Sequence, residues 1–150
     1  MEKIKINLDT KLSVIFNAVN GGNDVYLVVE NKPTDFWDSV KHFKRAEFAC
    51  KCGGKYCNGY PVEMSYELVS ILDSLREIAE SPIYVSSGIR CTRHNANVGG
   101  VENSYHKLGR ACDFRISGET STGTINLVKD MGVEYKELYA IDTKYVHIAV

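Results

Sequence analysis

The sequence shows no excess of charge of either sign. Its 18 lysines and arginines nearly balance its 19 aspartates and glutamates, and the formal net charge is -1 at pH 7. A protein that binds nucleic acid or an anionic membrane by its charge presents a basic field. The composition therefore indicates neither kind of partner.

Long hydrophobic segments are missing as well. No apolar run approaches the roughly 18 residues of a membrane-spanning helix. Residues 1–6 alternate polar and apolar side chains, whereas a secretory signal has an apolar core followed by a cleavage site. We therefore expect no membrane span and no signal peptide. A protein made in the cytoplasm without a signal peptide must leave the cell by another route if its target lies outside the cell.

Cysteine, in contrast, is more frequent than expected for a cytosolic domain. The chain has 5 cysteines in 150 residues, a length that buries about 68–70% of its unfolded surface and folds without covalent staples. Three interpretations are open for four of them: a closed zinc site of four thiolates, one or two disulfides, or small buried thiols in a loop. Spacing alone does not decide connectivity. These four residues are Cys50, Cys52, Cys57 and Cys91.

Hydrophobic periodicity predicts an α+β fold. A helix is indicated at residues 64–78, where apolar residues recur at helical spacing behind Ser65 as N-cap. A second helix is expected at 122–131, with Gly132 as its C-terminal cap. Strands are expected at residues 82–86, 111–116, 138–141 and 145–150. This order favours a small antiparallel sheet with helices packed on one face.

Residues 1–42 are expected to form an N-terminal, β-rich extension with a short helix, ahead of a domain at 43–150. A turn signal at 20–23 precedes a strand-like segment at 25–29, which resembles a β-hairpin. A short helix is expected to start near residues 34–35. The extension has three possible uses: an added edge of the sheet, a targeting piece or a hairpin that binds a partner. An added edge is the commonest outcome for so short a segment.

Residues 104–113 carry the residue types of an open zinc site. The imidazole of His106, the carboxylate of Asp113 and the imidazole of His147 provide three ligands, which leaves the fourth tetrahedral position to water. An open position distinguishes catalytic from structural zinc. Gly109 lets the backbone between the first two ligands turn tightly. The spacing of His106 and Asp113 alone would equally fit a turn residue and a strand-end residue.

The longer pattern is more specific. The chain reads Ser-x-His-x-x-Gly-x-Ala-x-Asp through Ser104, His106, Gly109, Ala111 and Asp113, and a His follows later. This motif resembles that of the zinc D-alanyl-D-alanine carboxypeptidases and dipeptidases, and of related phage endolysins that cleave L-Ala-D-Glu bonds. The similarity extends upstream through residues 87–90 and 95–100, so it covers roughly 43–150. It implies one catalytic Zn²⁺ and a fold similar to that of hedgehog signalling domains.

The resemblance also implies roles for two polar residues near the metal. Arg90 is expected beside it, where a guanidinium holds a substrate carbonyl or carboxylate and stabilises the developing oxyanion. Ser104 is expected to contact substrate. Cys112 alternates with Asp113 along a predicted strand, so its side chain should face away from the metal into the core.

The general base is where the chain departs from the family. In the dipeptidases and the L-Ala-D-Glu endolysins a Glu lies three residues before the last zinc ligand, whereas this chain has Lys144. Other members carry a His where this chain has Tyr145, and an Asp where it has Ala149. Tyr145 shares a strand face with His147 and is expected to donate to the oxyanion.

Another carboxylate must then take the proton of the attacking water. Asp142 is the nearest candidate along the chain, because a turn could carry it to the metal. Glu137 and Glu134 are more distant options. The sequence therefore predicts the zinc ligands more firmly than it predicts catalysis.

The resemblance implies a zinc peptidase that hydrolyses peptidoglycan stem peptides, as a D-Ala-D-Ala carboxypeptidase or an L-Ala-D-Glu endopeptidase. We expect a phage or prophage lysin, or a tail-associated hydrolase, that acts at the bacterial cell wall after release or as part of a virion. Two other functions stay open because the usual base is missing. One is a zinc-binding module without turnover, for which hedgehog domains are an analogy. The other is a virion structural protein with the same fold.

Overall fold

The computed structural model describes residues 14–18, 25–29 and 35–150. The chain divides into two compact units, residues 1–38 and 39–150. In the first unit β1 (Val14–Ala18) pairs with β2 (Val25–Val29) in antiparallel fashion. The strand expected at 25–29 is therefore present. The expected turn at 20–23 and the alternating segment at the N-terminus lie outside the described residues.

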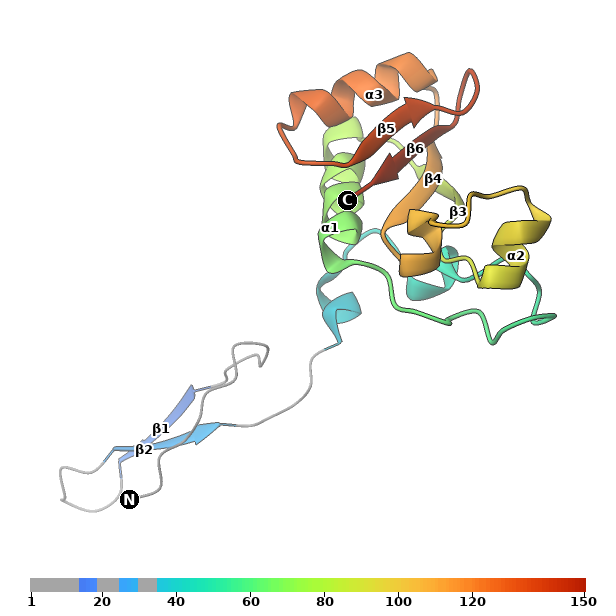
Figure 1. Cartoon of the computed structure of the whole chain (residues 1–150). Coiled ribbons are helices and arrows are strands. Elements are labelled where there is room, and N and C mark those ends of the chain that lie inside the picture. Colours follow the sequence, from blue (N-terminus) through green and yellow to red (C-terminus); the bar gives the residue numbers. More distant parts are fainter. Residues whose placement is uncertain (1–13, 19–24, 30–34) are drawn as a thin grey trace. The chain divides into compact units, whose positions relative to one another are not determined.

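A four-stranded antiparallel sheet forms the centre of the second unit (Figure 1). Its strands follow the order β3-β4-β6-β5, so that the last two strands of the chain form one edge. The bounds are Ile83–Ser87 for β3, Ala111–Ile116 for β4, Glu137–Ala140 for β5 and Val146–Ala149 for β6. All four expected strands are present within a residue or two of their predicted ends, so the α+β class is confirmed.

Two long helices pack against this sheet (Figure 1). They are α1 (Tyr66–Ala79) and α3 (Ser121–Asp130). The side chain of Ser65 accepts a hydrogen bond from the backbone N–H of Leu68, as an N-cap does. The core between helices and sheet consists of fully buried apolar side chains: Leu68, Leu72, Leu75, Phe114, Ile116, Val128, Val146 and Ile148.

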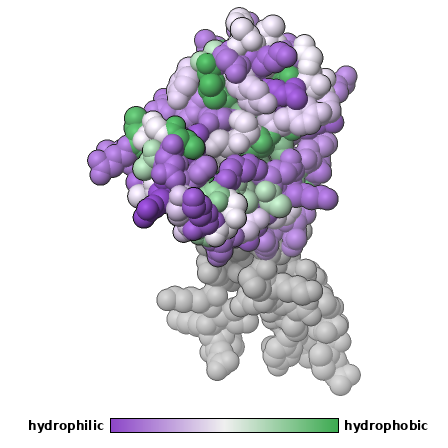
Figure 2. All heavy atoms as spheres, turned by 90° about the vertical axis from the view of Figure 1, so that its right-hand side faces the viewer, coloured by the Kyte–Doolittle hydropathy of each residue, from purple (hydrophilic) through white to green (hydrophobic). Residues whose placement is uncertain are grey.

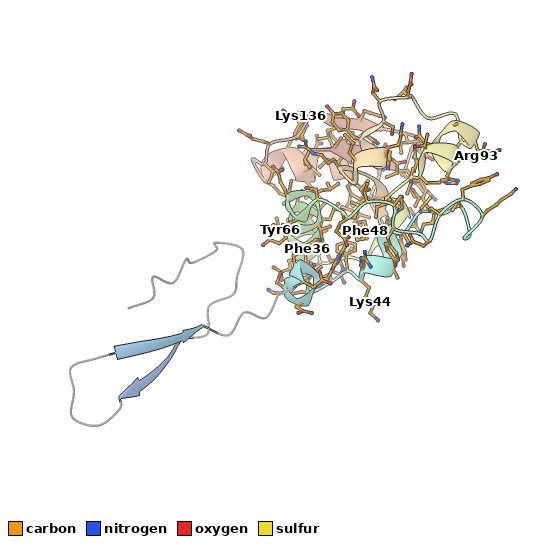
Figure 3. All side chains as sticks on the ribbon, turned by 60° about the horizontal axis from the view of Figure 1, so that its bottom comes forward. Phe36, Lys44, Phe48, Tyr66, Arg93 and Lys136 are labelled. Carbon is orange, nitrogen blue, oxygen red and sulfur yellow. The ribbon has the colours of Figure 1, made fainter. Side chains whose placement is uncertain are left out.

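The described residues also form shorter helical elements. They are the 3₁₀ helices η1 (Phe36–Ser39), η2 (Arg45–Phe48) and η3 (Tyr105–Leu108), and the α-helix α2 (Thr92–Asn97). The short helix expected near 34–35 is thus a 3₁₀ turn, in which the side chain of Asp35 accepts from the N–H of Trp37. Phe48 is fully buried and lies among the side chains of the domain interior, whereas Lys44 points outward (Figure 3).

The compact unit begins before the boundary expected at residue 43. The backbone N–H groups of Lys41 and His42 donate to the Asp73 carboxylate on α1, at 3.1 and 2.8 Å. These bonds attach the segment to the helix, which explains why the second unit starts at Ser39.

One face of the described surface is mainly polar. On the face shown in Figure 2, the described residues are mainly hydrophilic, and apolar residues form small separate groups. Among the helices of the described ranges, none is both long enough and apolar enough to cross a membrane.

Candidate metal centre

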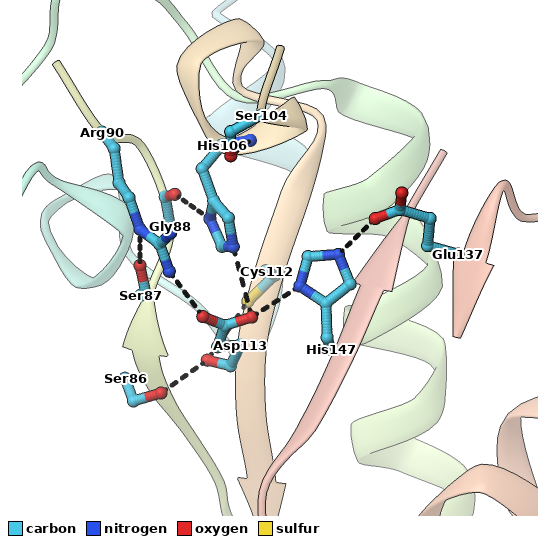
Figure 4. A network of polar contacts seen from close by, with 10 residues as sticks. All are labelled: Ser86, Ser87, Gly88, Arg90, Ser104, His106, Cys112, Asp113, Glu137 and His147. Atoms are coloured by element: carbon cyan, nitrogen blue, oxygen red, sulfur yellow. Dashed lines mark hydrogen bonds and ion pairs between the residues drawn. The ribbon is translucent and has the colours of Figure 1, made fainter. Parts of the chain in front are cut away.

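The register of the sheet brings four side chains into one row. Asp113 on β4 pairs with His147 on β6. On either side of them, Ser87 on β3 pairs with Asp113, and Tyr139 on β5 pairs with His147. Directly paired residues of antiparallel strands point to the same face and lie about 5 Å apart. Figure 4 shows Ser87, Asp113 and His147 of this row on one face of the strands, with a helix behind the other face.

The other histidine of the centre, His106, lies on η3. Ser104 caps the start of this 3₁₀ helix and Gly109 caps its end. The Ser104 hydroxyl accepts from the backbone N–H of His106 at 3.3 Å. Gly109 has a φ of +67°, and a Cβ there would lie 2.1 Å from the carbonyl oxygen of Glu63. Its own carbonyl accepts from the N–H of Ser65 at the start of α1. Glycine at this position therefore both ends η3 and lets it dock on the helix.

Three ligand atoms converge between η3 and the sheet. His106 Nε2 lies 3.2 Å and His147 Nδ1 lies 2.7 Å from Asp113 Oδ1. One ligand atom from each residue lies within 4.8 Å of those of the other two. The three residues are only 2%, 8% and 5% exposed, in the order His106, Asp113, His147. Two imidazoles and a carboxylate so arranged are the ligand set of an open zinc site.

The outer nitrogen of each imidazole faces an acceptor, which sets the tautomer. His106 Nδ1 lies 2.6 Å from the carbonyl oxygen of Gly88, and because a carbonyl only accepts, Nδ1 must carry the proton. His147 Nε2 lies 2.9 Å from a carboxylate oxygen of Glu137 and donates to it. In the neutral form of each ring the inner nitrogen then carries the lone pair that metal ligation requires, whereas in the charged form it donates to Asp113 (Figure 4).

The second oxygen of Asp113 is held by Arg90. Arg90 Nη2 donates to Asp113 Oδ2 at 2.7 Å, and its Nε donates to the Ser87 hydroxyl at 2.8 Å. Burial raises the pKa of Asp113, but the hydrogen bonds and charges of His106 and His147 outweigh it and hold the pKa well below its ordinary value. The carboxyl group is therefore ionised at neutral pH, as a metal ligand must be.

An open cleft of about 450 Å³ leads to these groups. Tyr139 stands at its side, where its ring stacks on that of His147 with centroids 4.6 Å apart. Burial, followed by the negative charges of Glu137 and Asp113, raises the pKa of Tyr139, so its hydroxyl stays protonated at neutral pH. The cleft is lined by Arg90, Gly99, Gly100, Val101, Asn103, Ser104, Tyr105, His106, Asp113, Glu137, Tyr139, Ala140, Ile141 and His147.

The structure gives two of the expected catalytic residues other positions. Neither Asp142 nor Tyr145 lines this cleft. Asp142 Oδ1 accepts from the backbone N–H groups of Lys144 and Tyr145, both at 2.7 Å, in the turn between β5 and β6. The Tyr145 hydroxyl accepts from Arg115 Nε at 3.2 Å. Both residues lie in or next to the turn of the β5–β6 hairpin. This turn lies beyond the paired residues His147 and Tyr139, so neither residue reaches the cleft.

Glu137 and Tyr139 occupy the cleft instead. They alternate along β5, so they share one strand face next to β6. Glu137 was already a more distant option for the base and directly precedes the strand expected at 138–141, and Tyr139 lies two residues further along. These positions identify the residues only once the β5–β6 register is known.

The cysteines also fall into two groups. Cys50, Cys52, Cys57 and Cys91 form a second cluster of metal-ligating atoms. Cys112 is fully buried, as expected for a side chain that faces the core. All five are free thiols.

Comparison with known proteins agrees with this geometry. No curated protein matches the chain. A family model described as Peptidase M15 matches residues 41–149, which include η3, the whole four-stranded sheet and every residue of the candidate centre. The chain therefore belongs to the peptidase M15 family of zinc D-Ala-D-Ala carboxypeptidase-like metallopeptidases.

Proposed function

We propose that the protein is a zinc-dependent peptidase that hydrolyses peptidoglycan stem peptides, as a D-Ala-D-Ala carboxypeptidase or an L-Ala-D-Glu endopeptidase. The observation that carries the proposal is the convergence of His106, Asp113 and His147 at the end of an open cleft. Membership of the family supports the reaction class. We further propose that it acts at the bacterial cell wall, as a phage or prophage lysin or a tail-associated hydrolase.

The three ligand side chains fit zinc in number, type and tautomer. When bound, zinc acidifies a water molecule and polarises the scissile carbonyl. The protein's own contribution is to bind the substrate, to orient it and to handle the proton.

Arg90 is placed to bind the substrate. Its guanidinium lines the cleft and is anchored by Asp113 and Ser87 through two of its nitrogens. A guanidinium has five N–H donors, so others are left for a carbonyl or carboxylate of the peptide. Tyr139 supplies a protonated hydroxyl from the opposite strand, in the role first expected of Tyr145. Ser104 also lines the cleft, and its contact with substrate stays a prediction.

We assign the carboxylate base to Glu137. It lines the cleft, its side chain is 44% exposed, and one oxygen is bonded to His147 Nε2. A carboxylate in this position both orients the histidine and reaches solvent in the cleft. Asp142 has neither property, because it lies in the turn between β5 and β6 and does not line the cleft.

Paired variants test this assignment. With zinc-loaded protein and purified peptidoglycan, released D-Ala and newly formed amino termini measure the two candidate reactions separately. E137Q should lower the rate by roughly 10²-fold or more, because a general base of this kind contributes about 10²–10⁴-fold. The matched control D142N keeps an acceptor in the turn and should leave the rate near that of the parent. A large loss in D142N together with an active E137Q would reverse the assignment.

The second candidate function is a zinc-binding module without turnover. It is favoured by Lys144, which stands where many relatives have their base, and by the engagement of Glu137 with His147. One measurement distinguishes the two functions. Zinc-loaded protein that sediments with peptidoglycan of several chemotypes but releases no termini would support the module and exclude the peptidase.

A further inference from the structure

Four cysteine sulfurs converge at a point separate from the histidine centre. Each offers an Sγ that lies within 4.8 Å of the other three, and Cys52 Sγ is 3.5 Å from Cys57 Sγ. Zinc held by four thiolates at ~2.3 Å in a tetrahedron places its sulfurs ~3.8 Å apart. A disulfide, in contrast, joins sulfurs in pairs and gives no reason for four to meet. The geometry thus separates two of the interpretations that spacing left open.

The loop at residues 50–59, which carries three of the sulfurs, turns back on itself. Gly53, Gly54 and Gly59 have φ values of +66°, +78° and +97°, which only glycine adopts readily. The backbone N–H of Cys50 donates to the carbonyl of Gly59 at 2.8 Å and closes the loop. Cys57 is thereby returned to the side of Cys50.

Backbone donors surround the sulfurs. The N–H of Cys91 lies 3.3 Å from Cys50 Sγ, that of Gly59 lies 3.4 Å from Cys57 Sγ, and that of His94 lies 3.4 Å from Cys91 Sγ. An N–H directed at sulfur favours the thiolate over the thiol, and thiolate is the form that binds metal. Burial acts in the opposite direction and raises the pKa of Cys50 and Cys57, so it is the convergence of all four sulfurs, rather than these donors, that distinguishes a metal site from buried thiols.

We propose that Cys50, Cys52, Cys57 and Cys91 bind a second zinc ion in a closed, structural site. Four thiolates fill the tetrahedral shell, so this site has no position for water or substrate. It joins the loop at 50–59 to the segment before α2, which would otherwise be connected by weaker contacts.

The second site supports the first one through residues 88–91. Ile89 N–H donates to the carbonyl of Phe48 at 2.8 Å, and Gly88 is so close to Phe48 that a Cβ would lie 2.6 Å from its oxygen. The next residues are Arg90, which binds Asp113, and Cys91 itself. Zinc at the cysteines therefore fixes the segment that holds both His106 and Asp113.

Metal analysis of the full chain, purified under reducing conditions, tests the proposal. The parent should hold about two zinc ions, and both H106A and C57S about one. Co²⁺ substitution distinguishes the sites, because only thiolate ligation gives an intense sulfur-to-metal charge-transfer band. The band should keep its full intensity in H106A and lose intensity in C57S, which has three thiolates left. The matched control C112A removes the one cysteine outside the cluster and should keep both ions and the band.

Thiol reactivity gives a second readout that does not need a folded variant. In the parent, zinc should protect the four cluster cysteines from an aromatic disulfide reagent, and a chelator should expose them. The proposal is overturned by a charge-transfer band of undiminished intensity in C57S, by zinc-independent thiol reactivity, or by disulfides among the four in protein kept reduced throughout. Because H106A and C57S address different ions, loss of one site does not imply loss of the other.

Discussion

Gly88 sets the tautomer of the metal ligand His106 and packs closely against the backbone of Phe48. Its carbonyl accepts from His106 Nδ1, and its Cα packs against Phe48. We expect G88A to push this carbonyl away, because the added Cβ would meet backbone atoms that cannot rotate aside. Zinc affinity should fall by about 10–100-fold, the usual effect of losing a partner of a ligating histidine.

A matched glycine provides the control for G88A. In G123A the nearest atom to the new Cβ is a carboxylate oxygen of Glu119, at the end of a flexible side chain. This variant should keep its zinc. Its free energy of unfolding should rise by up to about 1 kcal/mol, because alanine has a higher helix propensity than glycine. Competition with a chromophoric chelator measures both affinities. Equal affinity in G88A and the parent would contradict the role of the Gly88 carbonyl.

Asp142 makes a pH-dependent contribution to stability. Backbone N–H groups of Tyr145 and Lys144 lower its pKa in the folded protein. A carboxyl group whose folded pKa is depressed stabilises the fold above its unfolded pKa of about 3.9, and this contribution is lost as the pH falls through the folded value. The difference in melting temperature between the parent and D142A should therefore be largest near neutrality and disappear in acid.

Metal-free protein is required for that measurement, because acid also protonates the zinc ligands. Thermal unfolding of both proteins in chelator, followed by circular dichroism from neutral pH to below pH ~3, gives the difference directly. A difference that grows toward acid would have the wrong sign for a depressed pKa.

At the scale of elements, the hairpin of β5 and β6 decides which carboxylate reaches the cleft. Along the chain Asp142 is nearer to His147 than Glu137 is, and this proximity favoured Asp142 in the sequence. Across an antiparallel hairpin, however, a residue in the turn lies at one end of the strands, while a residue early in β5 lies beside the end of β6. Glu137 pairs with Ala149 and its side chain meets His147. Local sequence does not encode that register.

Other parts of the site were predictable because their signals are local. His106 and Asp113 stand in one short motif, and Ser65 caps a helix whose apolar residues recur at helical spacing. The cysteine cluster was left open for the opposite reason. Cys91 reaches the loop at 50–57 only because Ile89 and Gly88 pack on Phe48, a long-range contact that spacing does not reveal.

The attachment of residues 41–42 to α1 makes a prediction at the same scale. The Asp73 carboxylate accepts two backbone N–H bonds, whereas Glu77 makes exposed ion pairs with Lys41 and His42. Hydrogen bonds to a charged group contribute about 1.5–3 kcal/mol, whereas water and salt screen exposed ion pairs, which therefore contribute less. D73A should thus destabilise the domain more than E77A does.

Urea denaturation of the two variants, with zinc content as a check on the site, compares these contributions. Both should keep their zinc, because neither residue lines the cleft. Equal loss of stability in D73A and E77A would show that the two backbone hydrogen bonds to Asp73 stabilise the domain no more than the contacts of Glu77 do.

At the scale of the whole molecule, the candidate chemistry found among the described residues belongs to one unit. Both metal clusters, the cleft and the family match lie within residues 39–150. A chain that begins at Asp35 should therefore fold, hold as much zinc as the full chain and show the same charge-transfer band with Co²⁺. Loss of either metal from this shortened chain would contradict the division. Its rate on whole peptidoglycan, compared with that of the full chain, reports what the N-terminal residues contribute to wall binding.

The two histidines of the centre are held by different kinds of partner, and this bears on how metal comes and goes. His106 is fixed by a main-chain carbonyl on the buried side, whereas His147 lies between the half-exposed Glu137 and the ring of Tyr139, which is 51% exposed. The His147 side is thus the more exposed one. We expect exchange of the ion with solvent to proceed on this side, past Tyr139.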